Sequence, residues 1–385
     1  MKKLLLCLLC AIILIGCKTS NNLINYQVFN ESFVVPNISK IEDSFSFVLI
    51  PDSQSYVDYR LQMDSKPAYP VNQREIYYRQ TEWIQKNSIN NGGNLSFAIH
   101  LGDFVAHSKY KKKEWKYADI GTSKLIDSLP YLFVPGNHDY DTVMSLDFWK
   151  TMHLAGSRYY NKYFGPNSKY FKNKNWFGGA TKNGMNSWSL INAKGNNILL
   201  IGLQMEPSDK VLSWAQNIID NYPGYPTIIT THEYLVVQTN NQNSVNAEFC
   251  NEKYINYSPH NNSEQVWNKF IKKNNQIFLV LCGHSFAGNY GEGLRIDTNL
   301  YGNTVYSILT DYQGRNQFIE KMNISHSLNK IEECGDGWLR ILDVDLKTKK
   351  IHVKTYSTEF DIYETDNDSD YYLDINWEWG NRYNK

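Results

Sequence analysis

Six runs of apolar residues recur along the chain, and each has the length and flanking turn residues of a buried β-strand. Between them lie segments whose apolar residues recur at helical spacing. Strands that alternate with helices are typical of α/β proteins with parallel pairing. The predicted strands are 45–50, 95–101, 131–133, 197–202, 227–231 and 277–281, and the predicted helices are 73–87, 211–219 and 264–273.

The C-terminal part of the chain contains three further apolar runs, at 305–309, 338–346 and 351–356, which we interpret as consecutive strands that close a sheet. Residues 141–197 and 238–262 are rich in polar residues and are predicted to be mainly loops, with a hairpin near 188–191. No linker or internal repeat divides the chain. We therefore expect one α/β domain over 43–362, preceded by a tether and lead-in at 18–42 and followed by an acidic, aromatic tail at 363–385.

Polar side chains able to bind a metal ion follow five of the predicted strands. They are Asp52, Asp103, Asn137, His232 and His284. The carboxyl ends of the strands of an α/β sheet are where ligand sites assemble, so we expect these side chains to lie together. Carboxylate, amide and imidazole ligands suit divalent ions such as Mn, Fe or Zn.

The turn that follows strand 131–133 has three consecutive polar side chains that could take part in metal binding or catalysis. Gly136 permits a sharp bend, and Asn137, His138 and Asp139 come directly after it. Asn137 could bind a metal through its amide oxygen, and Asp139 could orient the His138 ring. The alternative is a turn in which Asn and Asp only satisfy local backbone groups.

The order of these motifs resembles that of the calcineurin-like metallophosphoesterases. The shared elements are Asp52-Ser53-Gln54, Gly102-Asp103, Gly136-Asn137-His138-Asp139, His232 and Gly283-His284. The resemblance covers roughly residues 43–360, and 338–342 and 355–357 also look like a bacterial branch of exported members. It implies a four-layer α/β/β/α sandwich of two mixed β-sheets flanked by helices, with two metal ions at its site.

The same resemblance assigns a role to each site residue. Asp103 would bridge the two ions, Asp52 and Gln54 would bind the first ion, and Asn137, His232 and His284 would complete the second. His138 would act beside the leaving group with Asp139 fixing its ring, and a metal-activated water would hydrolyse the phosphoester. The implied substrate is a small-molecule or lipid phosphoester, either a monoester or a diester.

Two positions depart from the family pattern. The family usually has histidine at the positions of Gln54 and Phe286. An amide oxygen is a weak ligand and a phenyl ring is none, so we predict one tightly bound ion and a second, weaker one at the first site. Gln313 is among the residues that could replace the missing ligand.

Two other functions are compatible with parts of the sequence. A catalytically weak or inactive surface lipoprotein could use the same scaffold to bind a glycan or another partner. The second function is that of an esterase with Ser285 as its nucleophile. The stretch Gly283-His284-Ser285-Phe286-Ala287 differs at one residue from the nucleophile elbow of esterases. The glycine-rich stretch 287–302 is poor helix material, however, and the elbow should open a helix.

The N-terminus has the pattern of a targeting segment. Lys2 and Lys3 precede an apolar run at 4–15 that is too short to span a bilayer. The following Leu14-Ile15-Gly16-Cys17 resembles the cleavage box of bacterial lipoproteins. We expect a signal peptide at 1–17, lipidation of Cys17, and an exported protein anchored to the membrane in the periplasm or at the cell surface. A plain secretory signal is the alternative.

Composition limits which binding partners and metal motifs the chain can have. Lys and Arg together number 39, and so do Asp and Glu, so no overall charge attracts nucleic acid. Beyond the signal segment the cysteines are Cys250, Cys282 and Cys334, whose spacing matches no zinc motif. In an exported protein Cys250 could pair with Cys334.

Overall fold

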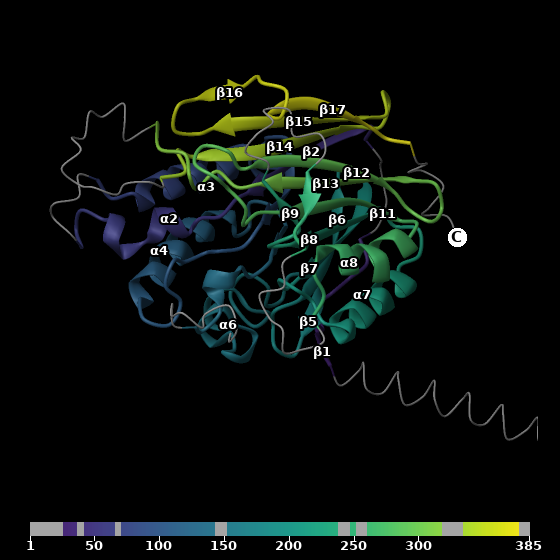
Figure 1. Ribbon diagram of the computed structural model, residues 1–385, viewed down its shortest axis with the longest axis horizontal. Helices are drawn as coiled ribbons and strands as arrows, with labels where there is room; N and C mark the ends of the chain where they lie inside the picture. Colours follow the sequence, from purple (N-terminus) through teal and green to yellow (C-terminus); the bar gives the residue numbers. More distant parts are fainter. Residues whose placement is uncertain are drawn as a thin grey trace, which may run out of the picture.

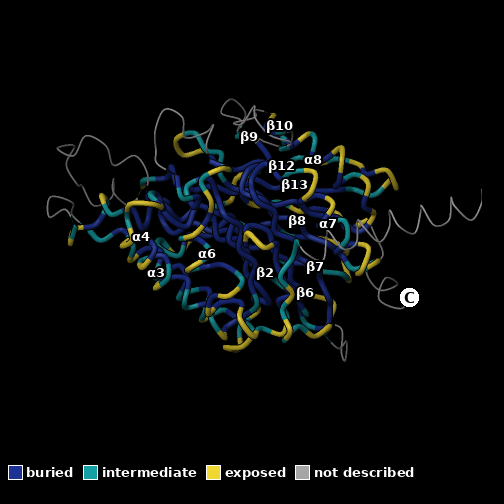
Figure 2. The backbone as a smooth tube through the Cα atoms, turned by 90° about the horizontal axis from the view of Figure 1, so that it is seen from below, coloured by how far each residue is buried: buried dark blue, intermediate teal, exposed yellow. Residues whose placement is uncertain are grey.

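Two large mixed β-sheets form the centre of the protein. The computed structural model describes residues 26–36, 42–65, 71–142, 152–237, 247–251, 260–317 and 334–376. Helices flank the sheets in two groups, with α2, α3 and α4 on the left of Figure 1 and α7 and α8 on the right. Buried backbone follows the strands through the interior, and most exposed segments lie at the periphery (Figure 2).

One sheet contains seven of the described strands. Its order is β16 (Ile362–Glu364), β15 (Lys350–Ser357), β14 (Trp338–Asp345), β2 (Ser44–Ile50), β3 (Leu95–His100) and β4 (Tyr131–Phe133), with β17 (Asp370–Asp374) also paired to β15. Strands β2, β3 and β4 are parallel, whereas β14 and β15 run antiparallel to their neighbours. The carboxyl ends of β2, β3 and β4 therefore share one edge.

The other sheet contains eight of the described strands. Its order is β1 (Gln27–Phe29), β5 (Phe177–Thr181), β6 (Ser187–Ala193), β7 (Asn196–Leu203), β8 (Thr227–Thr231), β11 (Ile277–Cys282), β13 (Thr304–Thr310) and β12 (Glu292–Thr298). Strands β7, β8, β11 and β13 are parallel. A separate two-stranded ribbon joins β9 (Leu235–Val236) to β10 (Glu248–Phe249).

The described helices are short or of medium length. They are α2 (Gln54–Val57), α3 (Arg74–Lys86), α4 (Lys112–Thr122), α6 (Arg158–Phe164), α7 (Asp209–Asn221) and α8 (Ser263–Lys269). Single 3₁₀ turns occur at Tyr59–Leu61, Ile89–Asn91, Ser123–Leu125, Asn137–Asp139, Met152–Leu154 and Ile271–Lys273. Among the described residues, none of the helices has the length and apolar character needed to cross a bilayer.

The continuous apolar runs of the central strands arise because both faces of each sheet are covered. In β2, Phe45, Phe47 and Leu49 point into the core between the sheets, and Val48 and Ile50 point into the core beneath α3 and α4. Successive side chains of a strand face opposite sides, so one run supplies two cores.

A third core lies between the eight-stranded sheet and the helices α7 and α8. In α7 the buried positions recur three and four residues apart, at Val211, Leu212, Trp214, Ala215, Ile218 and Ile219. Ser208 caps this helix by accepting a hydrogen bond from the backbone N–H of Val211. Three cores separate four layers, which confirms the predicted α/β/β/α sandwich.

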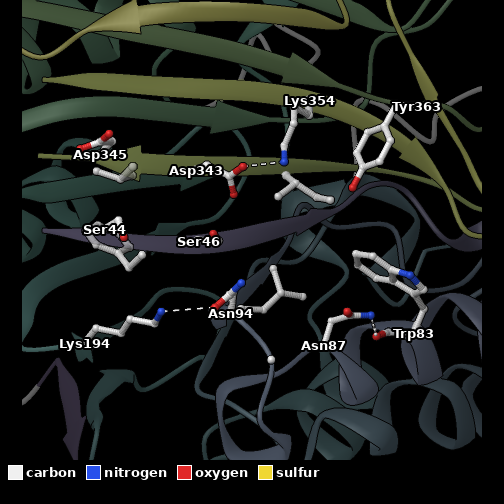
Figure 3. Close-up of a pocket in the computed structure, with 15 residues that line it drawn as sticks. Ser44, Ser46, Trp83, Asn87, Asn94, Lys194, Asp343, Asp345, Lys354 and Tyr363 are labelled. Atoms are coloured by element: carbon white, nitrogen blue, oxygen red, sulfur yellow. Dashed lines mark hydrogen bonds and ion pairs between the residues drawn. The ribbon is translucent and has the colours of Figure 1, made fainter. Parts of the chain in front are cut away.

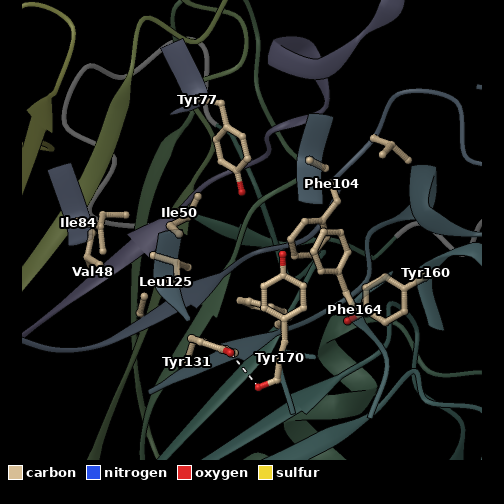
Figure 4. Close-up of a cluster of buried hydrophobic side chains, with 14 of the residues drawn as sticks. Val48, Ile50, Tyr77, Ile84, Phe104, Leu125, Tyr131, Tyr160, Phe164 and Tyr170 are labelled. Carbon is tan, nitrogen blue, oxygen red and sulfur yellow. Dashed lines mark hydrogen bonds between the residues drawn. The ribbon is translucent and has the colours of Figure 1, made fainter. Parts of the chain in front are cut away.

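An aromatic cluster holds the chain just after Asp103 in place. Phe104 lies among buried rings that include Phe164, whose ring centroid is 4.2 Å away (Figure 4). His100 stacks on the other ring face of Phe104, at 3.7 Å between centroids. In the same cluster the Tyr131 hydroxyl donates to the carbonyl oxygen of Tyr170 at 2.8 Å. This packing fixes the turn that presents Asp103.

Several elements differ from the sequence expectations. Glu292–Thr298 forms the edge strand β12, which was not predicted. Strand β17 extends the seven-stranded sheet past residue 362, where we expected the domain to end. Strand β1 adds part of the predicted lead-in to the other sheet. The predicted signal peptide and Cys17 lie outside the described residues, as does most of 238–262.

Candidate metal centre

The five predicted strand-end residues come together where the carboxyl ends of the two sheets meet. Asp52, Asp103 and Asn137 follow β2, β3 and β4, and His232 and His284 follow β8 and β11. Four of these side chains are buried almost completely, and His284 is partly exposed. Asp103, His232 and His284 each offer a ligand atom within 4.8 Å of the others.

His232 lies at the centre of the site. Its Nε2 atom is 3.0 Å from Asn137 Oδ1 and 3.3 Å from Asp103 Oδ2. The Nδ1 atom of His284 is 3.2 Å from the same nitrogen. On the other side of the ring, Nδ1 of His232 donates to the carbonyl oxygen of Leu101 at 2.8 Å. That hydrogen bond fixes the tautomer in which Nε2 is a metal ligand.

The electrostatics of this group favour a cation. Burial lowers the pKa of His232, but Asp103 and Asp52 outweigh burial and raise it to about 10. Burial, aided by the charge on His232, lowers the pKa of His284 to about 3. The carboxylates of Asp103 and Asp52 thus stabilise positive charge at His232. A divalent ion bound by the same side chains would supply more positive charge than a protonated His232.

The first predicted site contains buried acceptors that lack a hydrogen bond. Neither Asp52 Oδ2 nor Gln54 Oε1 has a hydrogen-bond partner among the described residues. Gln54 donates through Nε2 to Asp103 Oδ2 at 3.1 Å, and Asp52 Oδ1 accepts from the backbone N–H of His284 at 3.2 Å. Buried polar atoms are costly without a partner, and a bound cation would satisfy both oxygens. These residues fit a metal ion.

The backbone at the site is strained in the way expected of a functional position. Asp103 has φ 52° and His284 has φ 72°, both in the left-handed region that non-glycine residues rarely occupy. Glycines allow the ligands to approach one another closely. A Cβ atom on Gly136 would lie 2.0 Å from Asp103 Oδ1, and one on Gly283 would lie 2.2 Å from Asp52 Oδ1. Close packing therefore requires glycine at 136, before Asn137-His138, and at 283, before His284.

The turn that carries His138 corrects one sequence expectation. His138 Nδ1 hydrogen-bonds the carbonyl oxygen of Ala106 at 2.8 Å, instead of the Asp139 carboxylate. Asp139 accepts from the backbone N–H groups of Phe104 and Gly136, both at 2.9 Å. Because both carboxylate oxygens accept from backbone N–H groups, Asp139 connects the turn at 136–139 to the turn at Asp103.

Comparison with known proteins agrees with this arrangement. The sequence profile described as calcineurin-like phosphoesterase matches residues 46–287, which is more than half of the chain. The chain belongs to this family. Membership confirms the resemblance found in the sequence motifs and the predicted class of enzyme, a metallophosphoesterase.

Individual relatives have low sequence identity to this calcineurin-like phosphoesterase. The uncharacterised protein YvnB of Bacillus subtilis is 29% identical over 345 residues, which cover 86% of this chain and 22% of YvnB. The chain thus spans less than a quarter of that relative. The purple acid phosphatase PPD1 from yellow lupin (Lupinus luteus) seeds superposes with a TM-score of 0.50 at 12% identity, over 88% of this chain and 55% of that one. This likeness concerns the fold.

A dimetal phosphatase from Danio rerio is a more distant structural match. Its TM-score is 0.43 at 11% identity, and the aligned part covers 86% of this chain and 99% of that one.

Ser285 does not have the setting of an esterase nucleophile in this phosphoesterase. Its hydroxyl oxygen accepts a hydrogen bond from the backbone N–H of Val237 at 2.9 Å. A nucleophile elbow should open a helix, yet the next described element is strand β12. The position does not support the elbow.

Glu233 is a site residue that the sequence motifs did not reveal. Its Oε1 atom lies 3.5 Å from Nε2 of His284 and accepts a hydrogen bond from the Cys250 thiol at 3.0 Å. A carboxylate on the far nitrogen of a histidine ligand orients the ring and strengthens its other nitrogen as a donor. Cys250 is therefore engaged here, and the three described cysteines Cys250, Cys282 and Cys334 form no disulfide with one another.

We predict that Glu233→Gln weakens metal binding at the site of His284. Gln keeps the acceptor for Cys250 but removes the charge that orients His284, so affinity should fall roughly 10–100-fold. Isothermal titration of the metal-free protein measures the change. Glu248→Gln, on an exposed residue of the nearby strand β10, is the matched control. Equal affinity in both variants would contradict the role of Glu233.

A separate surface pocket lies away from the metal centre. Figure 3 shows its lining residues, among them Ser44 at the amino end of β2 and Asp345 opposite it. Lys354 pairs with Asp343 at 2.5 Å, and Lys194 donates to Asn94 at 3.4 Å. Asp52 follows the carboxyl end of β2, so this pocket is at the opposite end of the strand from the site.

Proposed function

We propose that this protein hydrolyses a phosphoester with the aid of divalent metal ions bound between the ends of its two sheets. The observation that carries the proposal is the convergence of buried acceptors on His232, together with two buried oxygens, Asp52 Oδ2 and Gln54 Oε1, that accept no hydrogen bond. Asp103 lies between the residues around His232 and the pair Asp52 and Gln54, since its Oδ2 atom contacts both His232 and Gln54. It is the natural bridging ligand.

The chain divides the catalytic work between ligands and one acid–base group. Asn137, His232 and His284 would hold one ion, and Asp52 and Gln54 the other. Bound ions would supply Lewis acidity toward the phosphoryl oxygens and lower the pKa of a water. His138, whose Nδ1 is held by the Ala106 carbonyl, would present Nε2 to the leaving-group oxygen as a proton donor. The mixed ligands of the His232 site suit Mn, Fe or Zn, with the ion at the Asp52 site bound more weakly.

The substrate class is tested by direct turnover. Protein from residue 18 onward is incubated with Mn²⁺, Fe²⁺ or Zn²⁺ and with aryl phosphate monoesters and diesters, nucleotides, sugar phosphates and phospholipid headgroups. We expect metal-dependent release of phosphate or of an aryl alcohol from at least one class. Metal binding without hydrolysis of any substrate would instead favour the inactive scaffold that binds a glycan.

We also propose that the protein is exported and anchored to a membrane through a lipidated Cys17, on the strength of the apolar run at 4–15 and the Leu14-Ile15-Gly16-Cys17 box. Acyl chains anchor a protein by burying methylene groups in the bilayer. The Cys17→Ser variant should leave the membrane fraction or remain unprocessed in fractionated cells, whereas Cys250→Ser should fractionate as the unmodified protein does. Unchanged membrane association of the Cys17 variant would exclude the lipid anchor.

A further inference from the structure

Strand β13 delivers an acidic residue to the edge where the metal ligands lie. β13 runs parallel to β11, with Cys282 beside Leu309. The residues that follow, Gly283-His284 and Thr310-Asp311, therefore leave the sheet at the same edge. Asp311 is 1% exposed, so its carboxylate is buried with the ligands and not in solvent.

Asp52, which follows β2, lies against the end of β11, the strand that neighbours β13. Gly283 lies directly against the Asp52 carboxylate, and the backbone N–H of His284 donates to it at 3.2 Å. Strand β11 thus brings Asp52 beside the end of β13. Because Cys282 lies beside Leu309, Asp311 leaves the sheet beside His284, the residue whose backbone N–H binds Asp52.

The end of β13 is itself held in a defined conformation. The backbone N–H of Asp311 donates to the Gly291 carbonyl at 2.7 Å, and Asp311 Oδ1 accepts from the backbone N–H of Gln313 at 3.0 Å. The Oε1 atom of Gln313 is buried without a hydrogen-bond partner among the described residues. Phe286 packs against Gly314 in the same turn. The turn that follows β13 thus contains buried oxygens and packs against Phe286, the position where the family pattern has an imidazole.

We propose that Asp311 is a ligand of the first metal ion, in place of the histidine that Phe286 replaces, and that this site is made of oxygen ligands throughout. The inference deepens the proposed function and rests on it. The oxygen donors are Asp52, Gln54, Asp311 and the shared Asp103.

The ligand chemistry then separates the two sites. Oxygen ligands suit hard ions such as Mn²⁺ and Mg²⁺, whereas the imidazoles of His232 and His284 suit Zn²⁺ and Fe²⁺. Hard ions bind more weakly than Zn²⁺ to comparable ligands. The weaker binding of the first ion follows from this difference in ligands.

Metal binding tests the inference without reference to turnover. The purified full chain, first loaded with one equivalent of Zn²⁺, is titrated with Mn²⁺ and followed by electron paramagnetic resonance of free and bound Mn²⁺. We expect one equivalent of Mn²⁺ to bind. Asp311→Asn should lower that affinity at least roughly 10–100-fold and leave the Zn²⁺ equivalent in place. Asp220→Asn, on an exposed helical carboxylate, is the matched control.

A second variant tests the same position by gain of a ligand. Phe286→His restores the imidazole of the family pattern and should shift the first site toward Zn²⁺, so that the chain retains two Zn²⁺ after dialysis. Circular dichroism verifies that each variant is folded, and if Asp311→Asn is not, Asp311→Glu keeps the charge and should keep the Mn²⁺ equivalent.

The outcomes separate the inference from the function on which it rests. Undiminished Mn²⁺ binding by folded Asp311→Asn overturns the role of Asp311, as does a wild-type chain that binds Zn²⁺ but no Mn²⁺. A wild-type chain that binds neither ion overturns the proposed function itself.

Discussion

His232→Ala should remove metal-dependent hydrolysis while leaving the protein folded. The ring of His232 contacts Asn137, Asp103 and His284, so its loss removes the proposed central ligand of the second site. Metal ions supply several kcal/mol of transition-state stabilisation, and each 1.4 kcal/mol is tenfold in rate. We therefore expect kcat/KM to fall by at least about 10³.

Asn137→Ala removes another ligand of the same ion and should behave similarly. The measurement is kcat/KM with saturating metal, together with metal content after dialysis. His352→Ala, on a half-buried histidine of strand β15 away from the site, is the control for loss of an imidazole. Wild-type metal content and activity in His232→Ala would contradict its assignment as a ligand.

His138→Ala should separate catalysis from metal binding. The imidazole of His138 is fixed through Nδ1 to Ala106, and its backbone N–H donates to Asp103 Oδ1 at 2.8 Å. The substitution keeps that backbone contact, so metal content should not change. A positioned acid–base group contributes roughly 10²–10⁴ in rate, and kcat should fall by that factor.

The leaving group provides the discriminating readout for His138. Protonation matters most for a poor leaving group, so the loss should be larger for an alkyl phosphate than for a nitrophenyl phosphate. Equal losses with both substrates, or lost metal in His138→Ala, would assign His138 a structural role instead.

Much of the site could be predicted from the sequence because each ligand follows a strand. Asp52, Asp103 and His232 come directly after apolar runs that are buried on both faces, and such runs are unmistakable in sequence. The carboxyl ends of parallel strands share an edge, so position along the chain implied proximity in space. Asp311 carried the same signal after the run at 305–309. Asp311 lies, however, after the strand next to the one that leads to Phe286, the position of the missing histidine.

Other features depend on tertiary contacts that no local pattern encodes. Glu233 reaches His284 from a different strand, and the Ala106 carbonyl that holds His138 is a backbone atom. Strand β17 is different, since its Tyr371, Leu373 and the following Ile375 alternate toward the core between the sheets. That period of two was present in the sequence, but the acidic residues just before it, Asp366, Asp368 and Asp370, made the segment look like a tail.

The central claim is that bound metal ions are required for phosphoester hydrolysis at this site. Its most direct test is to remove metal with a chelator and to restore it stepwise, with turnover of an aryl phosphate ester and metal content measured on the same samples. We predict no turnover by the metal-free protein and recovery that follows metal occupancy, absent in His232→Ala. Full turnover by the metal-free protein, or no turnover at full occupancy, would contradict the account.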